Sequence, residues 1–83
     1  MKTTFCGSFK NIIGPRVRQL RQSQGLTQKN LAERLQLAGF DLTDLTILRI
    51  ENGTRFVADY EVKALARVLG VSCGYLLGET ARE

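Results

Sequence analysis

Few residues in this chain are of the types that carry out covalent chemistry. Histidine is absent, so neither a Ser-His nor a Cys-His nucleophile can be assembled. Cys6 and Cys73 stand far apart and outside any CxxC pattern, and the sequence has no carboxylate cluster, glycine-rich phosphate loop or zinc-ligand spacing. We therefore expect two reduced thiols, no metal or cofactor, and a protein that is not an enzyme.

The side chains left for binding chemistry are mainly basic and amide groups, and the basic ones are unevenly distributed. Residues 1–34 contain seven Lys or Arg and one acidic residue, whereas residues 35–83 contain five and seven. The net charge of +4 is thus the sum of +6 on residues 1–34 and −2 on residues 35–83. This polarity favours a polyanionic partner, because each phosphate neutralised by a base releases counterions. A basic surface that only keeps the protein soluble would give the same counts.

The segment from Thr27 to Gly53 is predicted to form two short helices joined by a turn. Thr27 can cap the first helix, Gly39 can stop it in a left-handed conformation, and Thr43 can cap the second. The apolar spacing gives each helix one inward face. The inward residues are Leu31, Ala32 and Leu35 in the first helix and Ile47 and Ile50 in the second.

Within this segment, TQ followed by LAERL, and RIENG at the end of the second helix, resemble the helix-turn-helix domain of Cro/C1-type (XRE family) repressors. The similarity extends from about Ile13 to Leu77. It implies an all-α, compact five-helix lambda-repressor-like domain. It also implies that the two helices of the segment form the helix-turn-helix motif.

The sequence departs from the family pattern after LAERL, where a glycine usually begins the turn. Here QLAGF intervenes before Asp41, an insertion of five residues. We therefore expect a turn longer than usual and a first motif helix that ends near Ala38. Leu37 and Phe40 are expected to cover the added length, and Leu42 to fill the place of the turn's apolar plug.

The other helices are marked by their end signals. Gly14 and Pro15 predict the start of the first helix, since proline is tolerated at the first helical position. A fourth amphipathic helix is expected from near Asp59, and Ser72 can cap a last short helix. Further inward positions are Ile13, Val17, Leu20, Val62, Leu65, Ala66 and Leu69.

The predicted organisation is an N-terminal arm (residues 1–11), a helix-turn-helix domain (12–78) and a C-terminal tail (79–83). Phe5 and Phe9 on the arm either fold back onto their own core or pack against a partner subunit. No run of about 20 apolar residues is present, and MKTTFCGSFK lacks the hydrophobic stretch of a signal peptide. We expect a cytoplasmic protein that does not contact a membrane.

The resemblance implies that the second motif helix, from about Asp44 to Asn52, enters the major groove of double-stranded DNA while the preceding helix crosses the backbone. The residues expected to face the bases are Thr43, Asp44, Leu45, Thr46 and Arg49. Arg49 is the most informative, because a guanidinium can bind O6 and N7 of guanine together. The alternative is that Arg49 is simply an exposed arginine in water. The position of Arg49 in the motif favours the base contact.

Four further residues are expected to contact phosphates. Gln28 begins the first motif helix, where it can donate to a phosphate beside the free backbone amides. The resemblance assigns the same role to Asn52, and the basic residues Lys29 and Arg55 are placed to assist. We thus expect a sequence-specific transcriptional regulator of the repressor type that binds DNA as a homodimer.

Leu45 and Leu48 form an apolar pair on the face expected to meet water or DNA. Leucine can cover a thymine methyl, whereas an acid such as Asp44 is repelled by phosphates although it can accept from cytosine. The lengthened turn could instead cover the two leucines. Alternatively this face binds protein, as in an antitoxin-like or other interaction module on the same fold.

Two more expectations follow from the resemblance. Arg21 and Glu51 occupy positions at which related repressors carry a pair beneath the surface, so we expect a structural ion pair between the first helix and the second motif helix. Tyr75 and Leu76 give the last helix more apolar surface than a short helix needs. We expect them to form the dimer interface.

Overall fold

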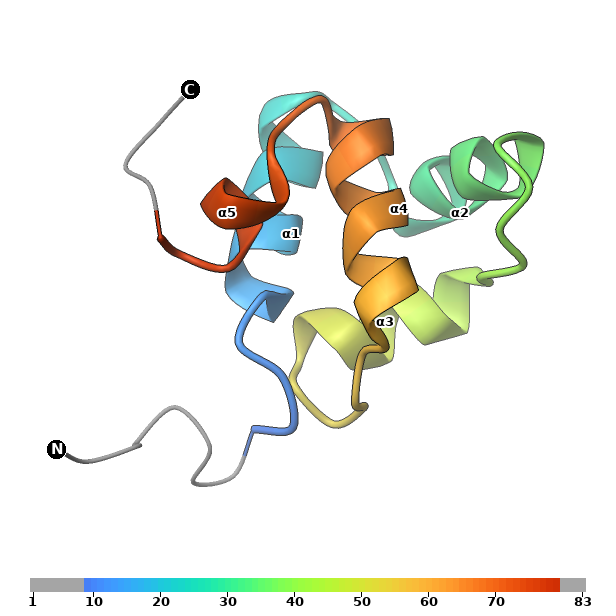
Figure 1. Cartoon of the computed structure of the whole chain (residues 1–83). Coiled ribbons are helices and arrows are strands. Elements are labelled where there is room, and N and C mark those ends of the chain that lie inside the picture. Colours follow the sequence, from blue (N-terminus) through green and yellow to red (C-terminus); the bar gives the residue numbers. More distant parts are fainter. Residues whose placement is uncertain (1–8, 80–83) are drawn as a thin grey trace, which may run out of the picture.

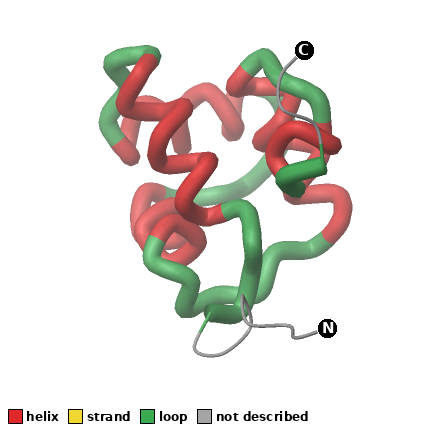
Figure 2. Tube along the Cα trace, turned by 90° about the vertical axis from the view of Figure 1, so that its left-hand side faces the viewer, coloured by secondary structure: helices red, strands yellow, loops and turns green. Residues whose placement is uncertain are grey.

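The computed structural model describes residues 9–79, which form five helices joined by turns and loops. They are α1 (Gly14–Ser23), α2 (Gln28–Leu37), α3 (Asp44–Glu51), α4 (Asp59–Leu69) and α5 (Cys73–Leu76). Figure 2 shows helices and loops, without a strand, in this part of the chain. The predicted all-α, five-helix class is confirmed.

The helices pack around α4, which contacts α1, α2 and α5. Figure 1 shows α1 and α5 on one side of α4, α2 on the other and α3 at the lower end. α3 contacts both α1 and α2. Because two helices hold it, this short helix has a fixed direction relative to the rest of the domain.

Side-chain caps begin α2, α3 and α5 at the predicted residues. The hydroxyl oxygens of Thr27, Thr43 and Ser72 accept hydrogen bonds from the backbone amides three residues further on, at 3.0, 3.2 and 3.0 Å. Asn30 also accepts from the Thr27 amide, which completes a reciprocal capping box. Gly39, directly after the C-cap residue of α2, has φ of +98°, a left-handed conformation that glycine adopts without strain.

A single apolar core lies between the helices. It contains the side chains that the sequence places on inward faces, while Leu20 and Val62 are half-buried at its edge. The fully packed members from those predicted faces are Ile13, Val17, Leu31, Ala32, Leu35, Ile47, Ile50, Leu65, Ala66 and Leu69. The predicted inward faces are confirmed.

The turn between α2 and α3 covers residues 38–43, longer than the usual connection of about 3–4 residues. Leu42 is buried and Phe40 half-buried against the core, as predicted. The expectation for Leu37 is wrong, since its side chain is 89% exposed. Two residues after the inward-facing Leu35, a helical side chain points to the opposite side of the helix, away from the core.

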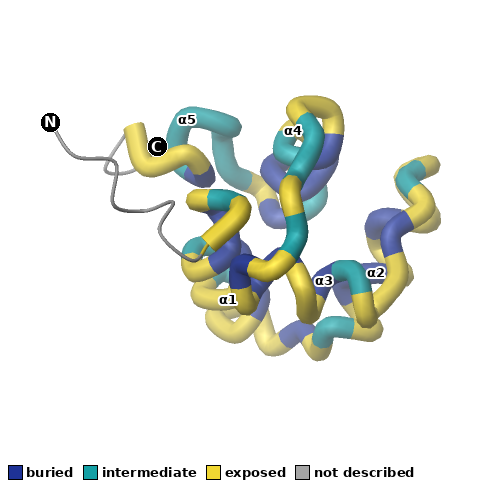
Figure 3. Tube along the Cα trace, turned by 90° about the horizontal axis from the view of Figure 1, so that it is seen from below, coloured by how far each residue is buried: buried dark blue, intermediate teal, exposed yellow. Residues whose placement is uncertain are grey.

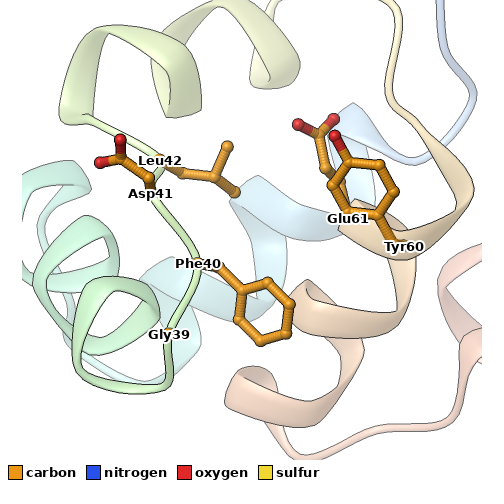
Figure 4. A pocket seen from close by; sticks show the side chains of 6 residues that line it. All are labelled: Gly39, Phe40, Asp41, Leu42, Tyr60 and Glu61. Atoms are coloured by element: carbon orange, nitrogen blue, oxygen red, sulfur yellow. The ribbon is translucent and has the colours of Figure 1, made fainter.

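An open pocket of about 230 Å³ lies between the long turn and the start of α4. Figure 4 shows Phe40 and Leu42 pointing from the turn towards α4, where Tyr60 and Glu61 form the opposite wall. The inserted residues therefore leave a hollow beside α4 and only partly extend the core.

The chain before α1 is held against the rest of the domain from residue 9 onward. The backbone amide of Lys10 donates to the carbonyl of Gly53 at 2.7 Å. Phe5 and the rest of residues 1–8 lie outside the described part of the chain. Residues 9–11, expected to belong to the arm, thus contact the loop after α3.

Candidate nucleic-acid interface

α3 has one buried and one solvent-facing side. Ile47, Ile50 and Glu51 are buried. The exposed face of α3 consists of Asp44, Leu45, Leu48, Arg49 and Asn52 just beyond its end. Figure 3, a view from below, shows buried and exposed residues alternating along α3, as a helix with one outward face requires. Thr46, expected to share this face, is half-buried at its edge.

The polar side chains at the start of α3 are bonded to the helix itself. Thr43 Oγ1 lies 3.2 Å from the backbone nitrogen of Thr46, from which it accepts, and 3.0 Å from the hydroxyl oxygen of the same residue. Asp44 Oδ1 accepts from the backbone nitrogen of Leu45 at 2.8 Å. These groups satisfy amides that a helix N-terminus leaves without intrahelical partners.

The expected ion pair between Arg21 and Glu51 is present and buried. Arg21 Nε lies 2.6 Å from Glu51 Oε2, and Nη2 lies 3.1 Å from Oε1. The third nitrogen, Nη1, donates to the carbonyl of Leu26 at 2.7 Å. Only 11% of the Arg21 side chain and 3% of the Glu51 side chain are exposed. The forked guanidinium therefore joins α1, the following loop and the last residue of α3.

Gln28, expected to donate to a phosphate, instead donates within the protein. Its Nε2 lies 3.0 Å from Glu51 Oε1, so the carboxylate receives hydrogen bonds from α1 and from the first residue of α2. A side-chain amide has two N–H groups, and this bond occupies one of them. The contact places the N-terminal end of α2 beside the C-terminal end of α3.

Asn52 and Lys29, both expected at the DNA backbone, are exposed. Asn52 Oδ1 accepts from the backbone nitrogen and the hydroxyl of Thr54, at 3.2 and 2.8 Å. Its Nδ2 group makes no hydrogen bond with residues 9–79, which leaves the donor end of the amide for an external acceptor. Lys29 lies in the first turn of α2.

Arg55, the other basic residue expected at a phosphate, is paired with Glu61. Nη1 and Nη2 lie 2.8 and 3.1 Å from the two carboxylate oxygens, and Nη1 also donates to the carbonyl of Phe56. The hydrogen bond from Arg55 lowers the pKa of Glu61, outweighing its burial, and the bond to Glu61 raises the pKa of Arg55. This guanidinium fixes the α3–α4 loop onto α4.

Asn11 is a positioning residue that sequence reasoning missed. Its Nδ2 donates to the carbonyls of Ile50 and Arg55 at 3.1 and 2.9 Å, and its Oδ1 accepts from the amide of Gly14 at 2.8 Å. The side chain thereby joins the start of α1 to the end of α3 and its loop. The sequence indicated this role only by placing an asparagine shortly before a helix, where its side chain commonly accepts hydrogen bonds from backbone amides.

Phe9 and Lys10 complete this contact with the loop after α3. The Phe9 ring lies so close to Gly53 that a Cβ there would come within 2.4 Å of it, and Gly53 has φ of +81°. Both features require glycine. Lys10 Nζ lies 5.3 Å from the centre of the Phe56 ring. Of the two alternatives for Phe9, the structure shows packing against its own chain.

A family model of the helix-turn-helix domain matches residues 12–74, well over half of the chain. The chain belongs to the helix-turn-helix family. Its predicted Cro/C1 type is confirmed by the solved structures that share its fold. This class consists of DNA-binding domains of regulators. A comparison with curated proteins gives no match.

Solved structures similar to this helix-turn-helix chain include a controller protein, a repressor and a hypothetical transcription factor. The restriction-modification controller protein C.AhdI from Aeromonas hydrophila is 31% identical, with a TM-score of 0.66 over 77% of this chain and 89% of that one. The P22 c2 repressor, solved with a synthetic operator, is 23% identical, with a TM-score of 0.69 over 84% and 98%. A hypothetical transcription factor from Neisseria, NHTF, is 23% identical, with a TM-score of 0.70 over 84% and 75%.

In the helix-turn-helix fold, α2 and α3 form the motif. The prediction that Tyr75 and Leu76 of the last helix form a dimer interface needs a correction. Leu76, expected at a dimer interface, is fully buried in the core. It lies one residue after the half-buried Tyr75, whose ring centre lies 4.8 Å from the Arg16 guanidinium carbon. Leu77 carries exposed apolar surface at this end instead.

None of the helices in residues 9–79 has the length and apolar character needed to cross a membrane. These residues also contain no group of three or more acidic or cysteine side chains placed to hold a metal ion. Cys73 is a half-buried free thiol.

Proposed function

We propose that this helix-turn-helix domain is a sequence-specific, double-stranded DNA-binding transcriptional repressor. The observation that carries the proposal is the exposed face of α3, which presents Arg49 and Asn52 while the buried Arg21–Glu51 pair fixes the helix from below. A helix held rigidly from one side and exposed on the other can enter the major groove.

The contacts divide into base reading and backbone positioning. Arg49, exposed on α3, would bind guanine through O6 and N7. Lys29, the donor end of Asn52 and the second N–H of Gln28 would contact phosphates on either side of the helix. Arg55 would contribute mainly by holding its loop, because both of its terminal nitrogens already bind Glu61.

The similar proteins support this assignment. The P22 c2 repressor was solved with an operator, and C.AhdI is a controller protein. The proposal includes a homodimer, because repressors with this motif read near-palindromic sites with two copies of the helix about 34 Å apart. It also includes a cytoplasmic location, since the partner is DNA.

Selection of bound sequences from random duplex DNA, followed by affinity measurements across a salt series, tests the proposal. We expect an enriched near-palindrome, and affinity that falls linearly with salt on logarithmic axes. Arg49→Ala should cost about 1–3 kcal/mol of binding free energy on the selected site and relax the sequence preference at one base pair. Lys29→Ala, the matched control, should weaken all sequences alike. Weak binding without sequence preference would overturn the proposal.

A second candidate function rests on the two leucines of the exposed α3 face. Leu45 is 49% and Leu48 41% exposed, so the long turn does not cover them. An apolar pair of this kind could instead bind another protein, in an antitoxin-like interaction module on the same fold. That function predicts loss of protein binding on Leu48→Ala and no selected DNA sequence.

A further inference from the structure

Leu45 and Leu48 are the apolar side chains on the exposed face of α3. They lie three residues apart, and Arg49 lies four residues after Leu45, so the three side chains are neighbours on the helix surface. On the opposite side of the helix the apolar residues are buried. The two leucines are therefore not an extension of the core.

The polar groups beside these leucines are bonded to the protein itself. Thr43 and Thr46 share a contact of 3.0 Å between their hydroxyl oxygens, and Thr43 also caps the helix. Asp44 Oδ1 accepts from the amide of Leu45. The first turn of α3 thus presents leucine carbon atoms, and Arg49, one turn further on, makes no side-chain hydrogen bond with residues 9–79.

In the major groove only thymine presents an apolar group, its C5 methyl, whereas guanine presents the paired acceptors that suit arginine. We infer that Leu45 and Leu48 read thymine methyls beside a guanine bound by Arg49. The preferred half-site therefore contains thymines opposite the first turn of α3. This inference rests on the proposed function and names its substrate class, a thymine-containing operator.

Basic and donor groups on and beside the exposed face of α3 favour DNA over an apolar protein partner. The one acidic residue of this face, Asp44, stands at its start, with one carboxylate oxygen bonded to the amide of Leu45. Arg49 is exposed on the same face, and the exposed donor end of Asn52 follows at its end. Gln28 at the start of α2 lies beside Glu51, which brings the exposed Lys29 to this end of α3 as well. Two leucines beside one arginine, with donor and basic groups at the C-terminal end of the same helix, match a base edge flanked by phosphates.

The test uses the operator selected from random duplex DNA. Each thymidine of the half-site is replaced in turn by deoxyuridine, which removes the methyl group and leaves every hydrogen-bonding group in place. At one or two positions the affinity of the wild-type protein should fall about fourfold, the effect of exposing one methyl-sized group. With Leu45→Ala or Leu48→Ala, the loss at the corresponding position should disappear.

Two controls separate this reading from a general effect of losing leucine or arginine. Leu37→Ala removes an exposed leucine at the far end of α2 and should keep the full deoxyuridine profile. Arg49→Ala should lose the guanine preference and keep the thymine effect. Identical deoxyuridine profiles for wild type, Leu45→Ala and Leu48→Ala would overturn the inference while leaving DNA binding intact. Failure to select any sequence would overturn the proposed function, and this inference with it.

Discussion

Glu51 accepts three hydrogen bonds, two from Arg21 and one from Gln28, although its side chain is almost completely buried. The three donors compensate the cost of removing its charge from water. Because Arg21 also binds the carbonyl of Leu26, losing either member of the pair disturbs groups on several elements.

Arg21→Ala and Glu51→Ala should therefore each lower the free energy of unfolding by about 3–5 kcal/mol, since each leaves a buried charge without its partner. The double mutant should lose much less than the sum, because it leaves neither charge. Urea denaturation of the four proteins in the cycle measures this coupling. Small, additive losses would show that apolar packing alone holds α3 in place.

Glu61 provides a second test at single-residue level. The hydrogen bond from Arg55 lowers its pKa below the ordinary value of 4.5, so the folded state binds fewer protons than the unfolded state just below that pH. The stabilisation is complete above pH 4.5 and is lost as the pH falls through the folded pKa. The unfolding free energy of wild type should fall more steeply below pH 4.5 than that of Glu61→Gln. Parallel curves would contradict the pKa shift.

At the level of elements, the sequence predicted helix positions well because the signals are local. A hydroxyl group caps a helix by accepting from an amide three residues further on. An apolar face likewise depends only on the spacing of residues within one helix. Thr27 and Thr43 therefore cap where expected, and the core faces are correct.

Side-chain partners were predicted less well, because a residue type does not specify which distant group it meets. Gln28 and Arg55 have the right chemistry for phosphates, yet Glu51 and Glu61 engage them. Leu76 looks like surface on a short helix, but the tertiary fold turns it inward. The Arg21–Glu51 pair was the exception, since the family resemblance supplied the distant partner.

Asn11 connects elements that no sequence pattern related, and its removal should weaken the fold. In Asn11→Ala the carbonyls of Ile50 and Arg55 lose a donor and the amide of Gly14 loses an acceptor. We expect a loss of about 1–3 kcal/mol in unfolding free energy, measured by urea denaturation. Gln22→Ala, an exposed position on α1, is the control and should change stability by less than about 0.5 kcal/mol. Equal stability of both variants would show that Asn11 is dispensable.

At the level of the whole molecule, the exposed α3 face and the α5 end occupy different parts of the surface. Figure 1 shows α3 at the lower end and α5 beside α1. A groove of about 200 Å³ lies between the segment before α1 and the start of α4, with Ile12, Val57, Val62 and Leu77 among its lining residues. A partner subunit at this groove would leave α3 open to DNA.

The expected dimer is best tested at Leu77. Tyr75 lies against Arg16, so a charge there would also disturb the contact between α5 and α1 within one subunit. Leu77 is 38% exposed, and Leu77→Glu would place a charge on the groove without removing a core side chain. Sedimentation should then show monomers, and affinity should fall more for a palindrome than for an isolated half-site. Leu37→Glu, which changes an exposed leucine on α2, should remain dimeric. If Leu77→Glu also remains a dimer, the subunits meet elsewhere, and the exposed edge of Phe9 becomes the next surface to test.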